Sequence, residues 1–320
     1  MPGKKQVICA GIIVADHVCS PISHVPAEGE LVPAESMFLT LGGCAANVAV
    51  DLVKLGVNAT PLGKVGDDAL GHLVLSLLKS RKVESSQVIC QPGLETSQTL
   101  IINVKGQDRR FVHSVGANAE FSDKDLTHEI AEQADLFYLG GYLLMKKLSS
   151  DHLASILHRV QKRGGITVLD VVTPGPGDYL PLLQPVLPYV DYFFPNEDEG
   201  QLITGIRDPL EQGKAFRKMG ARNAIITLGS KGTILCSQEG SWRAGIFPVQ
   251  FVDGSGSGDA FAAGFISGLL EGKNHLECLT LGSAAGASCV RGTGTTEFVF
   301  TQEECHQFIQ NHSLGIEKIA

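Results

Sequence analysis

In the segment VDGSGSGDAFAAGF, residues 252–265, three glycines alternate with small hydroxyl residues, and the carboxylate of Asp259 follows them. Glycines allow successive backbone N–H groups to converge on one point. The helix expected to begin near Gly258 would add the partial positive charge of its N-terminus. Gly256, Ser257 and Gly258 therefore predict an anion hole. A bound phosphate needs no carboxylate beside it, so Asp259 requires a separate explanation.

Phosphoryl transfer to an alcohol needs both features at once. A hydroxyl must lose its proton as it attacks the terminal phosphate, and the charge that develops must be held. Asp259 would then be the general base, and the glycine loop would stabilise the charge. The alternative is that Asp259 is a helix N-cap or first-turn residue. The motifs GxxxxGK[ST], HRD and DFG are absent, as is GxGxxG after the first expected strand.

The segment LGGCAAN, residues 41–47, opens an amphipathic stretch. Gly42 and Gly43 would let a ligand approach the backbone, and Asn47 could form hydrogen bonds with sugar hydroxyls. The alternative is a glycine turn followed by an asparagine at a helix start. This segment alone leaves both interpretations open.

The segment FFPNEDEG, residues 193–200, places Asn196 and Glu199 on one face of an expected helix. Oxygen ligands in this arrangement can hold Mg²⁺ or its water ligands beside phosphates. The alternative is a capping box, in which the two side chains only satisfy the start of the helix.

The segment ITLGSKG, residues 226–232, ends an apolar run in a glycine turn that carries Thr227, Ser230 and Lys231. These residues could grip nucleotide phosphates, or they could form a hairpin turn into the next strand. Three of the four segments follow an expected strand, and strand ends form the usual ligand crevice of an open α/β sheet.

Apolar runs of strand length alternate with amphipathic, helix-like stretches along most of the chain. This alternation predicts an α/β fold in which a mostly parallel sheet is covered by helices on both faces. The expected strands are 7–14, 59–65, 134–141, 166–172, 190–194 and 223–229, and the expected helices between them are 45–56, 67–82, 150–165 and 208–220.

Two regions, residues 17–41 and 96–116, interrupt this alternation. Both are half-polar and β-like, and residues 99–104 and 109–115 are expected to form a hairpin. They suit a small accessory sheet; a pair of long surface loops is the alternative. Such a sheet could stay exposed or pair with a second subunit to form a homodimer.

The charge and hydropathy exclude several classes of partner. The net charge is −8, the pI is about 5.7, and no block of Lys or Arg stands out, so we expect no attraction to nucleic acid or acidic membranes. No apolar run reaches the roughly 18 residues that span a bilayer. The apolar N-terminal segment is interpreted as a buried strand rather than a signal peptide.

The eight cysteines form no C-x-x-C pair, and the ten histidines show no H-E-x-x-H spacing. This pattern predicts mostly buried thiols in a reducing compartment, hence a cytoplasmic protein, and indicates neither a zinc site nor a disulfide framework.

The order GG-x-x-x-N, N-x-x-E, T-x-G-x-x-G and D-x-x-G-x-G-D-x-F resembles the ribokinase-like carbohydrate kinases, also called the phosphofructokinase B family. The resemblance runs from about residue 7 to residue 300. It implies a three-layer α/β/α sandwich, with residues 1–320 as a single domain and the two β-like regions as a lid. It also implies transfer of the γ-phosphate of ATP, with Mg²⁺, to a sugar or nucleoside hydroxyl.

The resemblance assigns roles to matching positions. It supports Asp259 as the base and Asn196 with Glu199 as the pair that organises Mg²⁺, with Glu199 acting through water. Thr227, Gly229, Ser230 and Gly232 would form the nucleotide turn, and Gly42, Gly43 and Asn47 the sugar loop. Asp16, at the end of the first expected strand, would accept hydrogen bonds from sugar hydroxyls. Asp253 and Ser255 match positions associated with a monovalent cation such as K⁺.

Two features of the sequence bear on the substrate. Ribokinases proper resemble GGKGAN at this place, whereas this chain has GGCAAN, with Cys44 and Ala45. The resemblance therefore does not indicate ribose as the substrate. Arg109 or Arg110 could lie over an acidic or phosphorylated sugar, or could form an exposed basic turn. We therefore predict an ATP-dependent sugar kinase. A nucleoside kinase, with Phe38 and Phe111 beside the base, and a sugar-binding regulator that has lost catalysis are the alternatives.

Overall fold

The computed structural model describes residues 5–107 and 109–320. Asp108, in the expected lid turn, and residues 1–4 lie outside the described part of the chain. The treatment of residues 1–320 as one domain stays a prediction. No described helix combines the length and the apolar character needed to cross a membrane.

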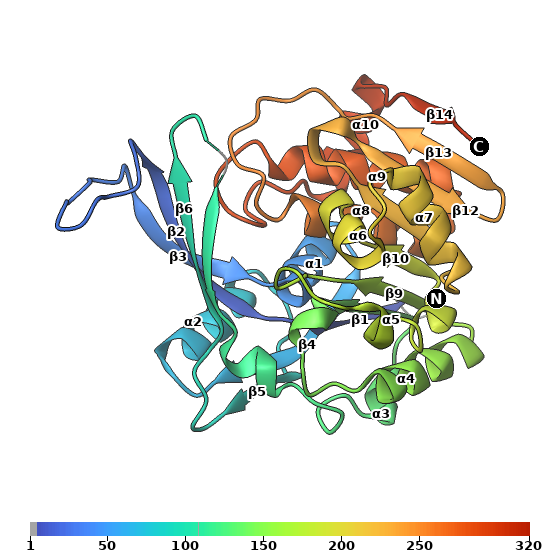
Figure 1. Ribbon diagram of the computed structural model, residues 1–320, viewed down its shortest axis with the longest axis horizontal. Coiled ribbons are helices and arrows are strands. Elements are labelled where there is room, and N and C mark those ends of the chain that lie inside the picture. The colour runs from blue at the N-terminus through green and yellow to red at the C-terminus, as the bar shows by residue number, and fades with distance from the viewer. Residues whose placement is uncertain (1–4, 108) are drawn as a thin grey trace.

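A ten-stranded sheet forms the centre of the described structure (Figure 1). Its strand order is β14-β13-β12-β11-β10-β9-β8-β1-β4-β5. Pairing is parallel from β5 to β11 and antiparallel from β11 to β14. The strands are β1 (Gln6–Gly11), β4 (Asn58–Gly66), β5 (Val88–Gln91), β8 (Leu136–Gly140), β9 (Ile166–Asp170), β10 (Tyr192–Phe194), β11 (Asn223–Thr227), β12 (Thr233–Ser237), β13 (Gly240–Ala244) and β14 (Ile316–Lys318).

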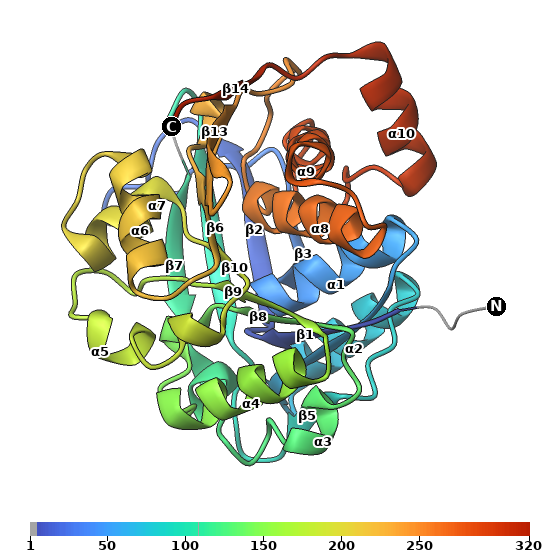
Figure 2. The same cartoon turned by 90° about the vertical axis from the view of Figure 1, so that its right-hand side faces the viewer.

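Helices cover both faces of this sheet, as Figure 2 shows. One layer contains α1 (Cys44–Lys54), α2 (Ala69–Ser80), α8 (Ser257–Leu270), α9 (His275–Cys289) and α10 (Gln302–Asn311). The opposite layer contains α3 (His128–Ala131), α4 (Ser150–Lys162), α5 (Leu180–Leu183), α6 (Glu197–Thr204) and α7 (Pro209–Lys218). Strand β1 shows why its sequence is apolar throughout: Val7 and Cys9 join the first core, and Ile8 and Ala10 join the second. The predicted α/β/α sandwich is confirmed.

A smaller sheet, the lid, projects from the main body at the left of Figure 1. Its strand order is β3-β2-β6-β7, with β2 (Val14–Ile22), β3 (Met37–Gly42), β6 (Gln98–Val104) and β7 (Arg110–Ser114). The expected hairpin is present as the antiparallel pair β6–β7. Both β-like regions therefore form a sheet rather than surface loops.

The start of the lid differs from the expectation. Residues 7–14 were expected to form one strand ending near Asp16, but β1 stops at Gly11 and β2 starts at Val14. The chain turns here because Gly11 has φ 135° and a Cβ atom on it would lie 2.0 Å from the Gly140 carbonyl oxygen. Asp16 consequently lies inside the lid sheet, opposite Thr40 of β3 and Thr99 of β6.

Asp68 connects the lid to the main body. It is the N-cap of α2 and accepts a 2.8 Å hydrogen bond from the Gly71 backbone N–H. Its carboxylate also accepts hydrogen bonds from the N–H of Thr96, at 2.8 Å, and from the Thr96 hydroxyl, at 2.6 Å. Thr96 lies just before β6, so one side chain fixes both a helix start and the root of the lid.

We predict that Asp68→Ala lowers the free energy of unfolding by about 2 kcal/mol, because it removes a cap and two further hydrogen bonds. Asp208→Ala is the matched control, since Asp208 caps α7 and accepts from Glu211 N–H. We expect this control to lose only about 1 kcal/mol. Urea denaturation measures both values, and equal losses would contradict a role for Asp68 at the lid root.

Candidate active site

The sequence-predicted residues gather where the parallel strands end. Asn196 follows β10, Thr227 ends β11, and an isolated parallel bridge joins these two residues. The helix start at Ser257 and the helix start at Cys44 contribute the remaining segments. This edge of the sheet is the place where ligands bind in open α/β folds.

Asp259 lies in the first turn of α8 but does not cap that helix. The N-cap is Gly256, without a side-chain cap bond. The Asp259 Oδ2 atom instead accepts a 2.8 Å hydrogen bond from the Asn47 Nδ2 atom of α1. The Asn47 Oδ1 atom accepts from the Thr295 hydroxyl at 3.1 Å. Asn47 therefore holds the carboxylate, and both ends of its amide have protein partners.

Cys44 is a member of this site that the sequence analysis treated only as a departure from a motif. Its thiol donates a hydrogen bond to Asp259. Burial raises the pKa of the Asp259 carboxyl, and the hydrogen bonds from Asn47 and Cys44 oppose that rise. In the sequence, Cys44 comes directly after two glycines at an expected helix start, and this position was the signal that could have placed it in the site.

The loop before Asp259 leaves the start of α8 open. Gly256 has φ 74°, and a Cβ atom there would lie 2.2 Å from the Thr295 carbonyl oxygen, so only glycine fits. A Cβ atom on the exposed Gly258 would meet nothing within 4 Å. The Ser257 hydroxyl donates back to the Gly254 carbonyl at 2.9 Å. The Ser257 N–H group also donates to the Gly254 carbonyl, at 3.3 Å, so the N–H group of Gly258 is the one at the open helix start that can face an anion.

Asp253 and Ser255 form a buried pair behind this loop. The backbone N–H and the hydroxyl of Ser255 both donate to the Asp253 Oδ1 atom at 2.9 Å. The Asp253 Oδ2 atom is buried and has no hydrogen-bond partner in the described part of the chain. A buried carboxylate oxygen without a partner fits a bound cation.

Asn196 and Glu199 form the capping box of α6. The Glu199 N–H donates to Asn196 Oδ1 at 2.8 Å, and the Asn196 N–H donates to Glu199 Oε2 at 2.9 Å. The structural alternative raised by the sequence is therefore present. Burial also raises the pKa of Glu199 to about 7, so this carboxyl is not in the solvated environment of an ordinary exposed cap.

Four carboxyl groups share the site: Asp16, Asp170, Glu199 and Asp259. Burial is the main cause that raises the pKa of each, and Asp259 adds to the rise at Asp16, Asp170 and Glu199. For Asp16 the value is about 7, despite a hydrogen bond from Thr99. Across the described residues, none of the four forms an ion pair with Lys or Arg.

The sequence analysis missed Asp170. It ends β9, and the Tyr138 hydroxyl donates to its Oδ2 atom at 2.8 Å. An acid within the apolar run ITVLDVV was the signal that could have found it. Asp170, Cys44 and Asp259 each offer an oxygen or sulfur atom within 4.8 Å of the others.

The glycine pair before α1, Gly42 and Gly43, leaves room for the Asp16 carboxylate of the lid to lie against this turn. A Cβ atom on Gly42 would lie 2.0 Å from the Asp16 Oδ2 atom, so a side chain here would displace the carboxylate. Gly43 is the N-cap of α1. Asp16 is 6% exposed and stands directly over this turn.

The turn after β11 presents backbone and one hydroxyl. Residues Gly229–Lys231 form a short 3-10 helix in the hairpin between β11 and β12. Ser230 is exposed, whereas the Lys231 ammonium pairs with the Glu197 carboxylate at 2.9 Å. Gly232 closes the turn with φ 93°. Lys231 thus ties this turn to α6.

The two lid arginines separate in space. A Cβ atom on Gly254 would lie 2.6 Å from the Arg109 Nη1 atom, so the Arg109 guanidinium rests against the loop that precedes α8. The exposed Arg110 guanidinium donates to the side-chain Oε1 atom of Gln107 at 2.6 Å. Only Arg109 therefore reaches the site.

Comparisons with known proteins identify the family of this chain. The family model described as pfkB family carbohydrate kinase matches residues 4–302. The ribokinase of Haemophilus influenzae is 27% identical over 315 residues, which cover 96% of this chain and 99% of that protein. The ATP-dependent 6-phosphofructokinase of Thermoanaerobacterium thermosaccharolyticum is 28% identical, covering 91% of this chain and 89% of that protein.

A solved structure of Arabidopsis thaliana ribokinase, complexed with ribose and ATP, is 26% identical and has a TM-score of 0.81. The match covers 95% of this chain and 98% of that one. These matches confirm the resemblance found in the motifs. The chain therefore belongs to the pfkB family of carbohydrate kinases and is a sugar-kinase phosphotransferase.

Proposed function

We propose that this enzyme transfers the γ-phosphate of ATP to a hydroxyl of a small carbohydrate, with Asp259 as the general base. The observation that carries the proposal is the position of the Asp259 carboxylate. Asn47 and Cys44 hold it at the open N-terminus of α8 rather than in a cap. A hydroxyl placed between this carboxylate and a phosphate at the helix start could lose its proton as it attacks.

The residues around Asp259 would divide the remaining tasks. The N–H groups of Gly256, Ser257 and Gly258 would hold the charge that develops on the transferred phosphate. The turn containing Thr227, Gly229, Ser230 and Gly232 would contact the nucleotide. The ribokinase structure with ribose and ATP, at 26% identity, supports ATP as the donor.

Two cations fit the site. Asn196 and Glu199 would hold Mg²⁺ through water, and the four carboxylates without a basic partner favour a cation there. Mg²⁺ would neutralise charge on the transferred phosphate. Asp253 and Ser255 would hold K⁺, which fits the Asp253 oxygen that lacks a partner among the described residues. Equal activity in K⁺ and Na⁺ would argue against K⁺ selectivity.

Asp16, Gly42 and Gly43 would position the acceptor sugar, and Asn47 would act indirectly by orienting Asp259. Arg109 beside Gly254 favours a sugar that carries a phosphate or carboxylate, and a 6-phosphofructokinase is among the matched relatives. A panel of neutral and phosphorylated sugars tests this preference. Arg109→Ala should raise KM only for the anionic sugars, and Arg110→Ala should leave KM unchanged.

A nucleoside kinase is the second candidate. Phe38 and Phe111 are partly exposed and flank Val18 and Ile101 in a cross-strand row. Residues two apart on a strand share a face, so this row lies on the face that carries Asp16. Its aromatic rings could stack on a base. Nucleosides in the same panel would show whether they are better acceptors than sugars.

We predict that Asp259→Asn lowers kcat by about 10²–10⁴-fold, the usual contribution of a positioned base. The amide keeps the shape of the side chain, so sugar binding measured by calorimetry should stay close to that of the wild type. Asp151→Asn, an exposed acid in α4, is the control and should keep full activity. Near-normal turnover in Asp259→Asn would refute the proposed mechanism. An inactive wild type that binds sugar would instead indicate a regulator.

Activity and stability should respond to pH in opposite directions. Burial raises the pKa of Asp16 and Glu199 to about 7, and their proposed roles need the ionised forms. We therefore expect kcat/KM to fall as the pH drops below about 7. The folded state binds these protons more tightly than the unfolded chain, so their stabilising effect is full below about pH 4 and is lost as the pH rises through 7.

Urea denaturation at about pH 6 and about pH 8 measures the second effect. Wild type should lose more stability than Asp16→Asn over this interval, because the variant lacks one of the titrating groups. A wild type that gains stability relative to the variant would contradict the raised pKa of Asp16.

We also propose a homodimer through the lid. Leu39, Leu100 and Val112 are 43%, 36% and 62% exposed, and they lie in one cross-strand row with His17. This row is on the face opposite Asp16, where a second copy could cover it. Val112→Glu should shift a dimer toward monomer in sedimentation equilibrium, and a monomeric wild type would refute the proposal.

A further inference from the structure

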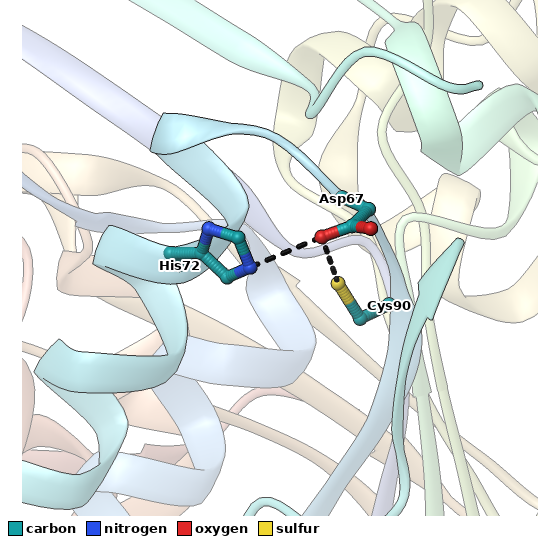
Figure 3. Close-up of side chains that lie close together, drawn as sticks. All are labelled: Asp67, His72 and Cys90. Atoms are coloured by element: carbon teal, nitrogen blue, oxygen red, sulfur yellow. Dashed lines mark hydrogen bonds and ion pairs between the residues drawn. The ribbon is translucent and has the colours of Figure 1, made fainter. Parts of the chain in front are cut away.

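Three side chains of types that can ligate a metal meet beside β5, an edge strand of the main sheet (Figure 3). Asp67 follows β4, His72 lies at the start of α2, and Cys90 lies in β5. The His72 Nε2 atom is 3.1 Å from Asp67 Oδ1, and the Cys90 Sγ atom is 3.8 Å from the same oxygen. All three ligand atoms lie within 4.8 Å of one another.

We propose that Asp67, His72 and Cys90 bind a divalent transition metal of the zinc class. Zinc takes nitrogen, oxygen and sulfur ligands at about 2.0–2.3 Å, which sets neighbouring ligand atoms of a tetrahedron about 3.3–3.8 Å apart. The observed distances need only small side-chain shifts to meet this requirement. A thiolate with an imidazole favours zinc over magnesium or calcium.

The surroundings of Cys90 favour a cation. Its Sγ atom also lies 3.6 Å from the Gly66 carbonyl oxygen, which could supply a fourth ligand if water does not. Burial, Asp67 and Asp68 all raise the pKa of the Cys90 thiol. The two carboxylates that disfavour a bare thiolate would stabilise a metal that displaces the thiol proton.

The site is open enough to load. The side chains of Asp67 and His72 are 45% and 63% exposed, so a hydrated ion can reach them. The bound metal would join the turn after β4, helix α2 and the edge strand β5. Since Asp68 in the same turn holds Thr96 at the lid root, the metal would also stiffen the base of the lid.

Cobalt titration of the metal-free full-length protein, without ATP, tests the proposal. Co²⁺ bound by a thiolate gives a near-ultraviolet sulfur-to-metal charge-transfer band. We expect one equivalent of Co²⁺ to produce this band, and Zn²⁺ to remove it by displacement. Cys90→Ser should abolish the band. His72→Gln should weaken binding at least about 10-fold, the loss that removal of even an outer partner commonly causes.

Two controls make the result specific. His24→Gln removes a similar exposed histidine–carboxylate pair, in which the His24 Nε2 atom lies 2.8 Å from Glu30. No cysteine belongs to a metal-ligating group with this pair among the described residues. Cys44→Ala removes the thiol of the active-site cluster with Asp170 and Asp259. Both variants should keep the band. No band in the wild type, a band that survives Cys90→Ser, or a band lost in Cys44→Ala would each overturn the proposal, whatever the kinase activity shows.

Discussion

The hydrogen bond between Asn47 and Asp259 joins the two halves of this enzyme's site. Asn47 belongs to α1, which follows the Gly42–Gly43 turn beneath Asp16. Asp259 belongs to α8, which follows the glycine loop at residues 254–258. In the proposed function, one amide would therefore fix the distance between the acceptor hydroxyl and the donor phosphate. Thr295 orients the same amide from its other end. In its proposed role as the general base, Asp259 would need little reorganisation during proton transfer.

The crowding of acids gives the site its electrostatic character. Burial is the main cause that raises the pKa of Asp16, Asp170 and Glu199, and the Asp259 carboxylate raises the pKa of each of them further. In the folded protein alone, ionisation of all four would be unfavourable. Binding of Mg²⁺ with the nucleotide would reverse that balance, and so the carboxylates are best ionised when donor and metal are present. In the proposed mechanism, this arrangement would link the binding of the nucleotide and Mg²⁺ to the ionised state of the carboxylates.

The sequence predicted the features that depend on local pattern. Asp259, the glycines before it and the strand ends at Asn196 and Thr227 could be placed because glycine turns and apolar runs have short-range signatures. Features that depend on tertiary approach could not be placed. The break at Gly11 follows from contact with Gly140, and Asp170 enters the site only through the order of the parallel strands.

The same limit explains why metal ligation was not expected from the spacing of cysteine and histidine. Asp67, His72 and Cys90 are distant in sequence, and it is the parallel pairing of β4 with β5 that brings Cys90 beside the turn before α2. That turn also carries Asp68, whose carboxylate holds the lid root, while Arg109 at the lid tip rests against Gly254. The lid is thus held at its base by the turn that contains Asp68. At its tip it contacts the glycine loop that contains Gly254. A metal at the proposed site would therefore stiffen the base of the sheet that carries Asp16 in β2 and Arg109 beside β7.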